Sequence, residues 1–301
     1  MREFFKKIYW NIYSTHQWNI LFKSINSDDW IRLNQPKNVS RADPFIINEN
    51  NRSYIFFEEF DISKRHGYLC VGELNQDTKS IDNVEVCLEK SYHLSFPNVF
   101  KYKDNYFMIP ESHENKSIDL YKFDNFPYKL KKVKTLVNDI DAVDSVIIFK
   151  DRLCYLFTNI LLNKNFYHSE NLSIFTSTDL FKGTFIENHT NPVESDPSYS
   201  RMAGQFFQEN DKLFRVSQDC QNMYGYKINI FQVDELSENY YKESLAKELF
   251  PPKGYIAFHT FNRSENIVVA DGKTIVKTPK VLMGNIFDLF NLLLKKIRIY
   301  K

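Results

Sequence analysis

The stretch Ser145-Val-Ile-Ile-Phe-Lys-Asp151-Arg152-Leu153-Cys-Tyr-Leu-Phe157 consists of two apolar runs joined by a short polar turn. The same pattern occurs five times in the chain of 301 residues. The other turns are Asn50-Asn51, Asp104-Asn105, Asn210-Asp211 and Asp271-Gly272, so that successive turns lie 47 to 61 residues apart. Paired strands around tight turns at this period are typical of β-propellers. The sequence therefore predicts an all-β, five-bladed β-propeller whose first strands surround one central pocket.

Composition and motifs exclude several classes of protein. The 39 Lys and Arg residues balance 38 Asp and Glu residues, so no overall positive field favours nucleic acid and no nucleic-acid binding is expected. The four Cys residues are dispersed, which argues against a zinc site or a disulfide scaffold and fits a reducing compartment. No signal peptide, dinucleotide-binding motif, P-loop or nucleophile elbow is visible. We therefore expect a cytoplasmic protein without a cofactor or metal.

The two ends of the chain differ from the repeats. Residues 1–40 form an N-terminal segment whose Trp30-Ile-Arg-Leu is expected to supply the outer strand of the last blade and close the ring, and the propeller itself spans residues 41–275. Residues 280–301 change to a helical period, with a broad apolar face and a basic end, which predicts a short amphipathic C-terminal helix. Residues 282–301 are too short and too interrupted to span a bilayer but suit peripheral contact with anionic lipid on the inner membrane face. The alternative is a helix packed on the rim of the propeller.

Three carboxyl groups stand at the ends of predicted strands near the centre. Asp43 precedes Pro44 at the start of the first inner strand, Asp144 has a similar place in the third repeat, and Glu111 closes the second strand of the second repeat. Glycosyl transfer needs one carboxyl that gives or takes a proton and another that stabilises oxocarbenium-like charge. We therefore predict Asp43, Glu111 and Asp144 as catalytic. The alternative is that the two Asp residues only cap strand-entry turns.

Further polar residues are predicted to bind the substrate. Glu58 and Glu59 close the strand of the first repeat that corresponds to the one ending at Glu111, and Glu59 is assigned to the site. Arg201 and Arg215 in the fourth repeat can pair with a phosphate or carboxylate, or can serve as counter-ions for the acidic pocket. At the entrances of inner strands, His93 and His259 are expected to line the pocket rather than to bind a metal.

A set of short motifs resembles one known family. The motifs are Ala42-Asp-Pro-Phe, Phe57-Glu-Glu, Tyr92-His-Leu-Ser-Phe-Pro, Ile109-Pro-Glu-Ser, Ser217-Gln-Asp-Cys with Tyr224-Gly225, and His259-Thr. Together they resemble, over about residues 18–272, the domain at the N-terminus of plant glucosamine inositolphosphorylceramide transferases that also occurs in bacterial surface-polysaccharide proteins. The resemblance adds Gln218, Asp219 and Tyr224 to the predicted substrate-binding residues.

That family is similar to the five-bladed furanosidase clan of arabinanases, xylosidases and fructan-acting enzymes. The clan uses an Asp on the first blade, which Asp43 matches, and completes its triad with a second Asp and a Glu, for which Asp144 and Glu111 are the candidates. The order along this chain is Asp, Glu, Asp rather than the clan's Asp, Asp, Glu. Which carboxyl acts as the acid therefore stays open.

The resemblance and the carboxyl groups lead to one favoured function and two alternatives. We predict a glycosyltransferase, of furanosyl type, that uses an activated sugar donor and a glycan or glycolipid acceptor to assemble a bacterial cell-surface polysaccharide, in the cytoplasm or on the inner membrane face. A glycoside hydrolase of the furanosidase clan would use the same carboxyl groups. A non-catalytic glycan-binding propeller would bind through its aromatic residues instead.

Overall fold

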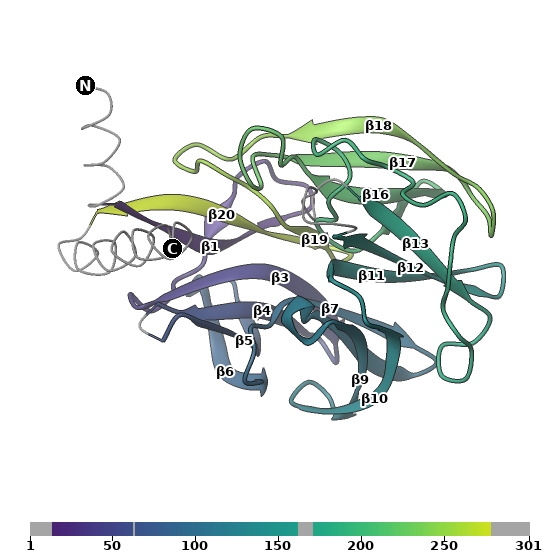
Figure 1. The fold of residues 1–301 in the computed structure, drawn as a ribbon. Helices are drawn as coiled ribbons and strands as arrows, with labels where there is room; N and C mark the ends of the chain where they lie inside the picture. Colours follow the sequence, from purple (N-terminus) through teal and green to yellow (C-terminus); the bar gives the residue numbers. More distant parts are fainter. Residues whose placement is uncertain (1–13, 63, 162–170, 278–301) are drawn as a thin grey trace, which may run out of the picture.

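The computed structural model describes residues 14–62, 64–161 and 171–277, and in them the chain forms five four-stranded antiparallel sheets (Figure 1). The sheets are the blades of a propeller, and the strand named first in each blade lies nearest the middle of the ring. The predicted all-β, five-bladed fold is therefore confirmed. The predicted C-terminal helix falls in 280–301 and lies outside the described residues. No helix in the described part of the chain has the length and apolar character needed to cross a bilayer.

The blades follow the order of the sequence. Blade 1 consists of β3 (Val39–Glu49), β4 (Arg52–Asp61), β5 (His66–Asn75) and β6 (Ser80–Leu88). Blade 2 consists of β7 (Ser95–Tyr102), β8 (Asn105–Glu111), β9 (Ser117–Asn125) and β10 (Lys129–Asn138), with the short 3-10 helix η1 (His113–Asn115) between β8 and β9. Blade 3 consists of β11 (Ala142–Lys150), β12 (Leu153–Ile160), β13 (Leu172–Ser177) and β14 (Ile186–Glu187).

The last two blades complete the ring. Blade 4 consists of β15 (Phe207–Glu209), β16 (Lys212–Gln218), β17 (Ile228–Leu236) and β18 (Tyr241–Leu249). Blade 5 consists of β19 (Phe261–Arg263), β20 (Ile267–Lys277), β1 (Ser14–Ser24) and β2 (Ile31–Arg32). Because β1 pairs with β20 along its whole length, from Ser14↔Lys277 to Ser24↔Ile267, the two ends of the sequence share one sheet. The outer strand of that sheet is Ile31–Arg32, within the segment Trp30-Ile-Arg-Leu.

Four of the five predicted turns join the first and second strands of a blade. In each of them both loop residues have positive φ, which suits the right-handed twist of the flanking strands and favours Asn and Asp. The loops are Asn50-Asn51, Lys103-Asp104, Asp151-Arg152 and Asn210-Asp211, so the second lies one residue earlier than predicted.

The fifth predicted turn, Asp271-Gly272, is wrong. Both residues lie within the continuous strand β20, where Asp271 pairs with Ile20 of β1. The turn of this blade comes earlier, where the Ser264 N–H donates to the Ile267 carbonyl at 2.8 Å. The polar interruption in β20 has another cause, because the carboxylate of Asp271 is fully buried and accepts hydrogen bonds from the N–H of Asp43 in β3 and from that of His259 in the segment before β19.

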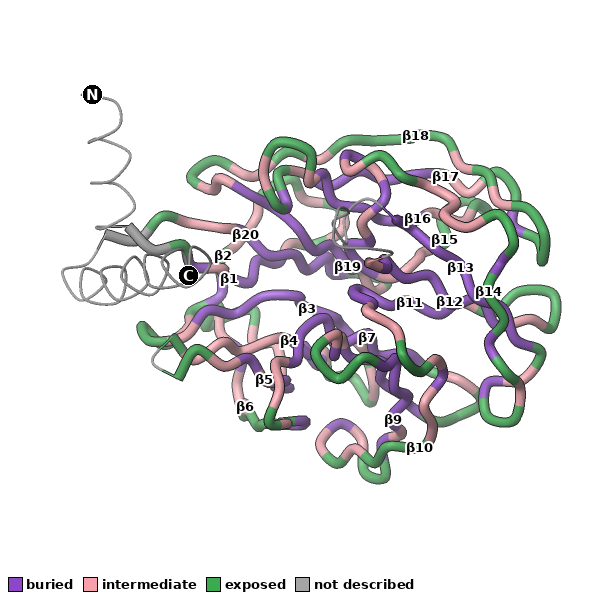
Figure 2. The backbone as a smooth tube through the Cα atoms, in the orientation of Figure 1, coloured by how far each residue is buried: buried purple, intermediate pink, exposed green. Residues whose placement is uncertain are grey.

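The aromatic content of the chain is explained by the contacts between blades. Phe45 of blade 1 and Phe96 of blade 2, for example, are both buried and meet edge to face with ring centroids 4.9 Å apart. Figure 2 shows the inner strands mostly buried, whereas β10 and β18 at the edges of their blades are largely exposed. The inner strands are thus held rigidly by packing, and polar side chains that they direct toward the centre are held with them.

Candidate functional site

The inner strands of blades 1, 2 and 3 each contain a bulge at the same place. Pairing with the second strand is interrupted between Ala42 and Phe45, between Ser95 and Asn98, and between Val143 and Val146. In each bulge the residue that follows the last regular pair has a positive φ: +52° for Asp43, +44° for Phe96 and +52° for Asp144. A bulge with such a residue re-aims a side chain that the regular pleat would place elsewhere. The repeat therefore gives Asp43 and Asp144 equivalent positions in blades 1 and 3.

The second strands add two equivalent Glu residues. Glu58 pairs with Ala42 in blade 1, and Glu111 pairs with Ser95 in blade 2, each beside the bulge of its own blade. Electrostatic interactions connect Glu58 with Asp43 and Glu111, and connect Glu111 with Asp144. We call Asp43, Glu58, Glu111, Asp144, Asp271, Arg201 and His259 the axial cluster.

Arg201 is the counter-ion on one side of the axial cluster. Its Nε donates to Asp144 Oδ2 at 2.7 Å, and its Nη2 lies 4.0 Å from Glu111 Oε2. The guanidinium also lies over the ring of Tyr224, 5.2 Å from its centroid. Because the Arg201 side chain is only 12% exposed, it neutralises Asp144 from within the protein rather than from the surface.

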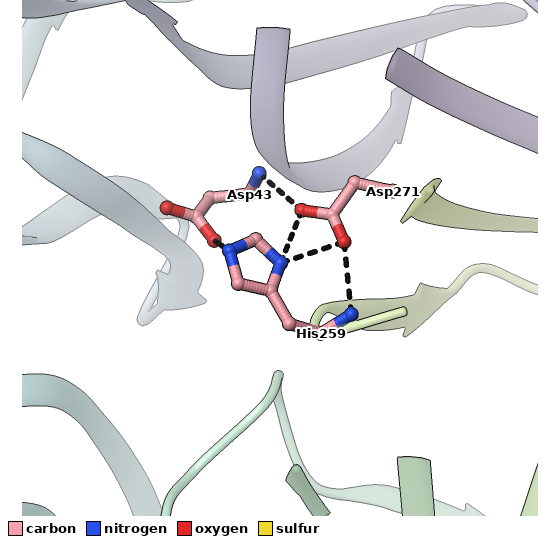
Figure 3. A group of neighbouring side chains, drawn as sticks. All are labelled: Asp43, His259 and Asp271. Atoms are coloured by element: carbon pink, nitrogen blue, oxygen red, sulfur yellow. Dashed lines mark hydrogen bonds and ion pairs between the residues drawn. The ribbon is translucent and has the colours of Figure 1, made fainter. Parts of the chain in front are cut away.

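His259 is the cationic group on the other side. Its Nδ1 lies 2.7 Å from the Asp271 carboxylate and its Nε2 lies 3.7 Å from Asp43 Oδ1, so the ring stands between two carboxylates (Figure 3). The ligand-type atoms of these three residues lie within 4.8 Å of one another, which is close enough for one cation. All three are, however, already engaged with one another and with backbone N–H groups, which is the arrangement of a hydrogen-bond network.

Burial and mutual repulsion keep protons on part of the cluster. Burial raises the pKa of Glu111 well above 4.5, and the nearby Asp144 raises it further although Arg201 lowers it. Burial likewise raises the pKa of Glu58 well above 4.5, with Asp43 and Glu111 adding to the effect. The pKa of Asp43 is raised by burial only to about 6, because His259 opposes the shift. The cluster therefore combines two carboxyls, on Glu58 and Glu111, whose pKa is raised well above 4.5 with an Asp43 whose pKa of about 6 leaves it mostly ionised at pH 7.

The Glu58 carboxyl has a His partner in a space left by a glycine. His93 Nε2 lies 3.4 Å from Glu58 Oε1, and its side chain is 30% exposed. A Cβ on Gly67 of β5 would lie 2.3 Å from the His93 ring and 2.8 Å from Glu58 Oε1. Only the absence of a side chain at Gly67 therefore allows His93 to reach Glu58. His93, predicted from the sequence to line the site, belongs to it through this contact.

Glu59, the residue chosen from the sequence, points away from the axial cluster. It accepts hydrogen bonds from Arg41 Nε at 2.8 Å and from the Tyr68 hydroxyl at 3.0 Å. Successive side chains on a strand point to opposite faces, so Glu58 and Glu59 of β4 cannot both face the centre. Glu58 takes the place that was predicted for Glu59.

Arg215 is also not part of the cluster. It is fully buried and forms a bidentate pair with Glu243 of β18, with N···O distances of 2.5 and 2.7 Å. Its Nη2 also donates to the Tyr199 carbonyl at 2.8 Å. Its Nη1 faces the Ser200 carbonyl and Met202 Sδ, so these contacts tie β16 to the outer strand β18 and to the segment before the blade, and Arg215 has a structural role and no donor left for a ligand.

The three residues suggested by the family motif differ in their surroundings. Tyr224 is 44% exposed and meets the His259 ring edge to face at 5.3 Å, which places it at the solvent side of the cluster. Gln218 is buried and donates to the Met202 carbonyl at 3.0 Å, which leaves it in the framework of blade 4. Asp219 accepts from the Gln221 N–H at 3.0 Å and holds the loop that carries Tyr224.

The structure thus brings together most of the predicted site residues. The ones in or beside the axial cluster are Asp43, His93, Glu111, Asp144, Arg201, Tyr224 and His259. Glu58 and Asp271 were missed. A count from the turns identifies Glu58, because Glu58 and Glu111 each lie seven residues after the last residue of their turn. No such count identifies Asp271, because the Asp271-Gly272 pair between two apolar runs was predicted to be a turn.

Two hollows in the surface lie away from this site. One of about 490 Å³ lies on the β5–β6 hairpin and is lined by Glu73, Asp77 and Asp82 among others. Another of about 480 Å³ lies between blades 3 and 4 and includes Phe149 and Lys212. Neither contains a member of the axial cluster, so the site is assigned from its charges and geometry.

Comparison with known proteins places these residues in a family context. A family model described as "Glucosamine inositolphosphorylceramide transferase 1, N-terminal" matches residues 9–256. Over 204 residues the chain is 30% identical to "Glucosamine inositolphosphorylceramide transferase 1" of Oryza sativa subsp. japonica, covering 67% of this chain and 27% of that protein. The protein of the same name from Arabidopsis thaliana is 28% identical over 204 residues, 67% of this chain and 26% of that protein. The chain therefore spans about a quarter of the length of the curated relatives it matches.

Solved structures with the same fold are glycoside hydrolases. Zg3597, a family 117 glycoside hydrolase from Zobellia galactanivorans, superimposes with a TM-score of 0.54 at 14% identity, covering 89% of this chain and 94% of that one. An exo-beta-1,3-galactanase from Clostridium thermocellum superimposes with a TM-score of 0.53 at 11% identity, covering 79% of this chain and 64% of that one. At these identities the similarity concerns the fold alone.

Proposed function

The chain belongs to the family of the N-terminal domain of glucosamine inositolphosphorylceramide transferase 1, and on this basis we propose that its axial cluster transfers a glycosyl group. The relatives are named as transferases of a sugar to a lipid. The observation that carries the proposal is that the buried carboxyls of one cluster divide into Glu111, whose pKa is raised well above 4.5, and Asp43, whose pKa is about 6. Such a division, set by the surroundings of each group, supplies the acid and the base that glycosyl transfer needs.

The proposed step assigns one role to each carboxyl. Glu111, whose pKa burial and Asp144 raise well above 4.5, acts as the acid and gives its proton to the oxygen of the leaving group as the bond from that oxygen to the sugar breaks. Asp43, mostly ionised at pH 7, accepts the proton of the acceptor hydroxyl as the new bond from oxygen to the sugar forms. Asp144 lies between Glu111 and Arg201, where its charge raises the pKa of Glu111 and so keeps the acid protonated.

The exposed members of the site indicate the side from which a ligand arrives. His93 and Tyr224 retain the most exposure, 30% for the His93 side chain and 44% for Tyr224. An aromatic ring beside buried acids suits the C–H face of a sugar. We therefore place the sugar against Tyr224, with its reacting carbon toward Glu111 and Asp43.

The proposal extends to the chemical class of the donor and of the acceptor. The donor is an activated sugar of furanosyl type, because the fold is that of enzymes acting on such sugars, including the arabinofuranosidase of Podospora anserina. The acceptor is a glycan or glycolipid, in keeping with the lipid named in the relatives. In a bacterium such a reaction serves the assembly of a cell-surface polysaccharide.

We place the reaction in the cytoplasm, at the inner face of the membrane. The support is the sequence of residues 282–301, in which apolar positions at helical spacing precede a basic end. Deletion of residues 280–301 should then leave a folded propeller that no longer sediments with vesicles containing phosphatidylglycerol. Unchanged sedimentation would overturn this placement.

The same carboxyl pair can use water as the acceptor, which makes a glycoside hydrolase the second candidate. The two are separated by their products, since transfer attaches the labelled sugar to a lipid or glycan and hydrolysis releases it as a free reducing sugar.

The experiment compares wild type with Asp43→Asn and Glu111→Gln in an extract of the source organism that glycosylates its native acceptor. Each variant should lose roughly 10²–10⁴-fold in rate, which is what one positioned acid or base contributes. The matched control is Glu59→Gln, which makes the same chemical change on the other face of β4 and should retain transfer at a temperature where it stays folded. Full turnover by Asp43→Asn would show that the propeller only binds the glycan.

A further inference from the structure

The fifth blade contributes a carboxylate that no sequence motif marked. Asp271 is fully buried and accepts three backbone hydrogen bonds, from the N–H groups of Asp43 at 2.9 Å, His259 at 3.1 Å and Thr260 at 3.0 Å. A fourth partner is His259 Nδ1 at 2.7 Å (Figure 3). Four donors around one carboxylate hold its charge and its orientation.

The same carboxylate fixes the orientation of His259. Because Nδ1 faces Asp271, it carries a proton, and the opposite nitrogen Nε2 is left facing Asp43 Oδ1 at 3.7 Å. The ring of Trp18 stacks on the imidazole with centroids 3.8 Å apart and planes 11° apart, which prevents the imidazole from turning over. The His259 side chain is 4% exposed, so a ligand meets Asp43 rather than His259.

Asp43 is held by the same group of residues from two directions. Its N–H is bound by Asp271, and its Oδ1 accepts from the Thr260 hydroxyl at 2.7 Å. These contacts support a backbone with φ of +52°, which is uncommon for a residue with a side chain. The other carboxylate oxygen, Oδ2, accepts from the Phe96 N–H of blade 2 at 3.2 Å, so the contacts from blade 5 fix the backbone and Oδ1 of Asp43.

We propose that Asp271 and His259 act as a positioning pair for Asp43, with Asp271 orienting the imidazolium and the imidazolium keeping Asp43 ionised and directed toward the substrate. The role assigned to Asp43 rests on the proposed function, whereas the pair itself rests on the geometry. Neither residue is a catalytic residue, because both act through Asp43.

The charges around the pair are consistent with this arrangement. Burial lowers the pKa of His259, but the carboxylates of Asp271, Asp43 and Asp144 outweigh it, so the pKa is raised above 6.5. For Asp43, burial raises the pKa, and the charges of Asp271 and Asp144 raise it further. The charge of His259 lowers it. The titratable groups that interact with Asp43 are His259, Asp271, Asp144, Glu58, Glu111 and Tyr224. Loss of the His259 charge would therefore raise the pKa of Asp43.

The test follows the titration of Asp43 directly, by NMR of the full chain labelled with ¹³C at the Asp carboxyl carbons, in wild type, His259→Gln and Asp271→Asn. In wild type Asp43 should titrate with a midpoint of about 6. In both variants that midpoint should rise by roughly one to three pH units, because a neighbouring positive charge is lost or weakened. Turnover at pH 7 should fall at the same time, through kcat rather than KM.

Asn262→Ala is the matched control. Asn262 also joins blade 5 to blade 1, through a hydrogen bond to the Pro44 carbonyl at 2.8 Å, but no hydrogen bond or ion pair links it to the pair or to the Asp43 carboxylate. It should leave the midpoint of Asp43 in place. Should Asp271→Asn fail to fold, because an amide cannot accept from four donors, His259→Gln answers the same question.

The outcomes separate the inference from the proposed function. An Asp43 midpoint unchanged in His259→Gln and in any folded Asp271→Asn would overturn the positioning pair, whatever the turnover. A raised midpoint together with full transfer by Asp43→Asn would support the pair and refute the function proposed for Asp43.

Discussion

Replacing Glu58 and Glu59 by Gln, one at a time, makes the same chemical change on adjacent residues of β4 and should shift stability in opposite directions. Glu59 is paired with Arg41 at 2.8 Å, and the two side chains are only 12% and 7% exposed. Gln at this position leaves the Arg41 guanidinium buried without a counter-charge. Removing one partner of a buried ion pair costs about 3 kcal/mol or more.

The change at Glu58 has no such cost. Burial and the neighbouring carboxyls Asp43 and Glu111 raise the pKa of Glu58, so the folded protein holds a proton there that the unfolded chain loses above about 4.5. Stability contributed by this proton is present at low pH and is lost as the pH rises toward the folded pKa. Glu58→Gln removes that loss, so the variant should be more stable than wild type at pH 7, by a margin that grows with pH above 4.5.

The assay is urea unfolding followed by tryptophan fluorescence at several pH values. With a slope of about 3 kcal/mol per M, Glu59→Gln should lower the midpoint by about 1 M, whereas Glu58→Gln should raise it at pH 7. In the transfer assay Glu58→Gln should be the less active variant, because it changes a member of the axial cluster, whereas Glu59→Gln does not. If the two variants shift the midpoint in the same direction at pH 7, the assignment of faces on β4 is wrong.

Three further changes test other parts of the site. As the pH rises from 3.8 to 6, the unfolding free energy of Asp43→Asn should increase by about 3 kcal/mol relative to that of wild type, because folded wild type retains a proton over this range that the unfolded chain has lost. A difference in unfolding free energy that does not vary with pH would contradict the raised pKa of Asp43. Gly67→Ala should push the His93 ring off Glu58 and into solvent, so that the pKa of His93, which burial lowers, returns toward 6.5 in a ¹H–¹³C titration; an unmoved His93 resonance would show that the space is not needed. Arg215→Met should cost about 3–5 kcal/mol in denaturant unfolding, because Glu243 stays buried without its cation, and a loss below about 1 kcal/mol would instead free Arg215 for a role in binding.

The fold was predictable from the sequence because its turns have a strict local requirement. Both loop residues of a two-residue hairpin need positive φ, which selects Asn and Asp, and the flanking runs are apolar because the blades pack on each other. That requirement alone located four of the five hairpins, to within one residue. It failed at Asp271, where a polar residue interrupts an apolar run and accepts hydrogen bonds from the N–H of Asp43 in β3 and from that of Thr260 just before β19.

The site was less predictable because its composition depends on which face of a strand a residue occupies. One residue separates Glu58 from Glu59, and the pleat sends them to opposite faces, so an error of one position exchanges a site residue for a structural ion pair. Arg215 was misassigned for a related reason, since its partner Glu243 is 28 residues away on the outer strand. Pairing across a sheet is set by register, which residue types alone do not reveal.

The shared sheet of blade 5 also bears on the biosynthesis of the protein. Of the strands that the structure describes, β1 and β2 leave the ribosome first, and β20, with which β1 pairs from Ser14↔Lys277 to Ser24↔Ile267, leaves it last. At about 5–20 residues per second, roughly 10 to 50 seconds pass between the two. Blades 1 to 4 draw all their strands from the intervening chain, so each can form while the ring is still open. Throughout that interval β1 has an unpaired edge, and Asp43 lacks the hydrogen bonds from Asp271 and Thr260 of blade 5. The nascent propeller therefore has neither a closed ring nor a complete site until β20 has been synthesised.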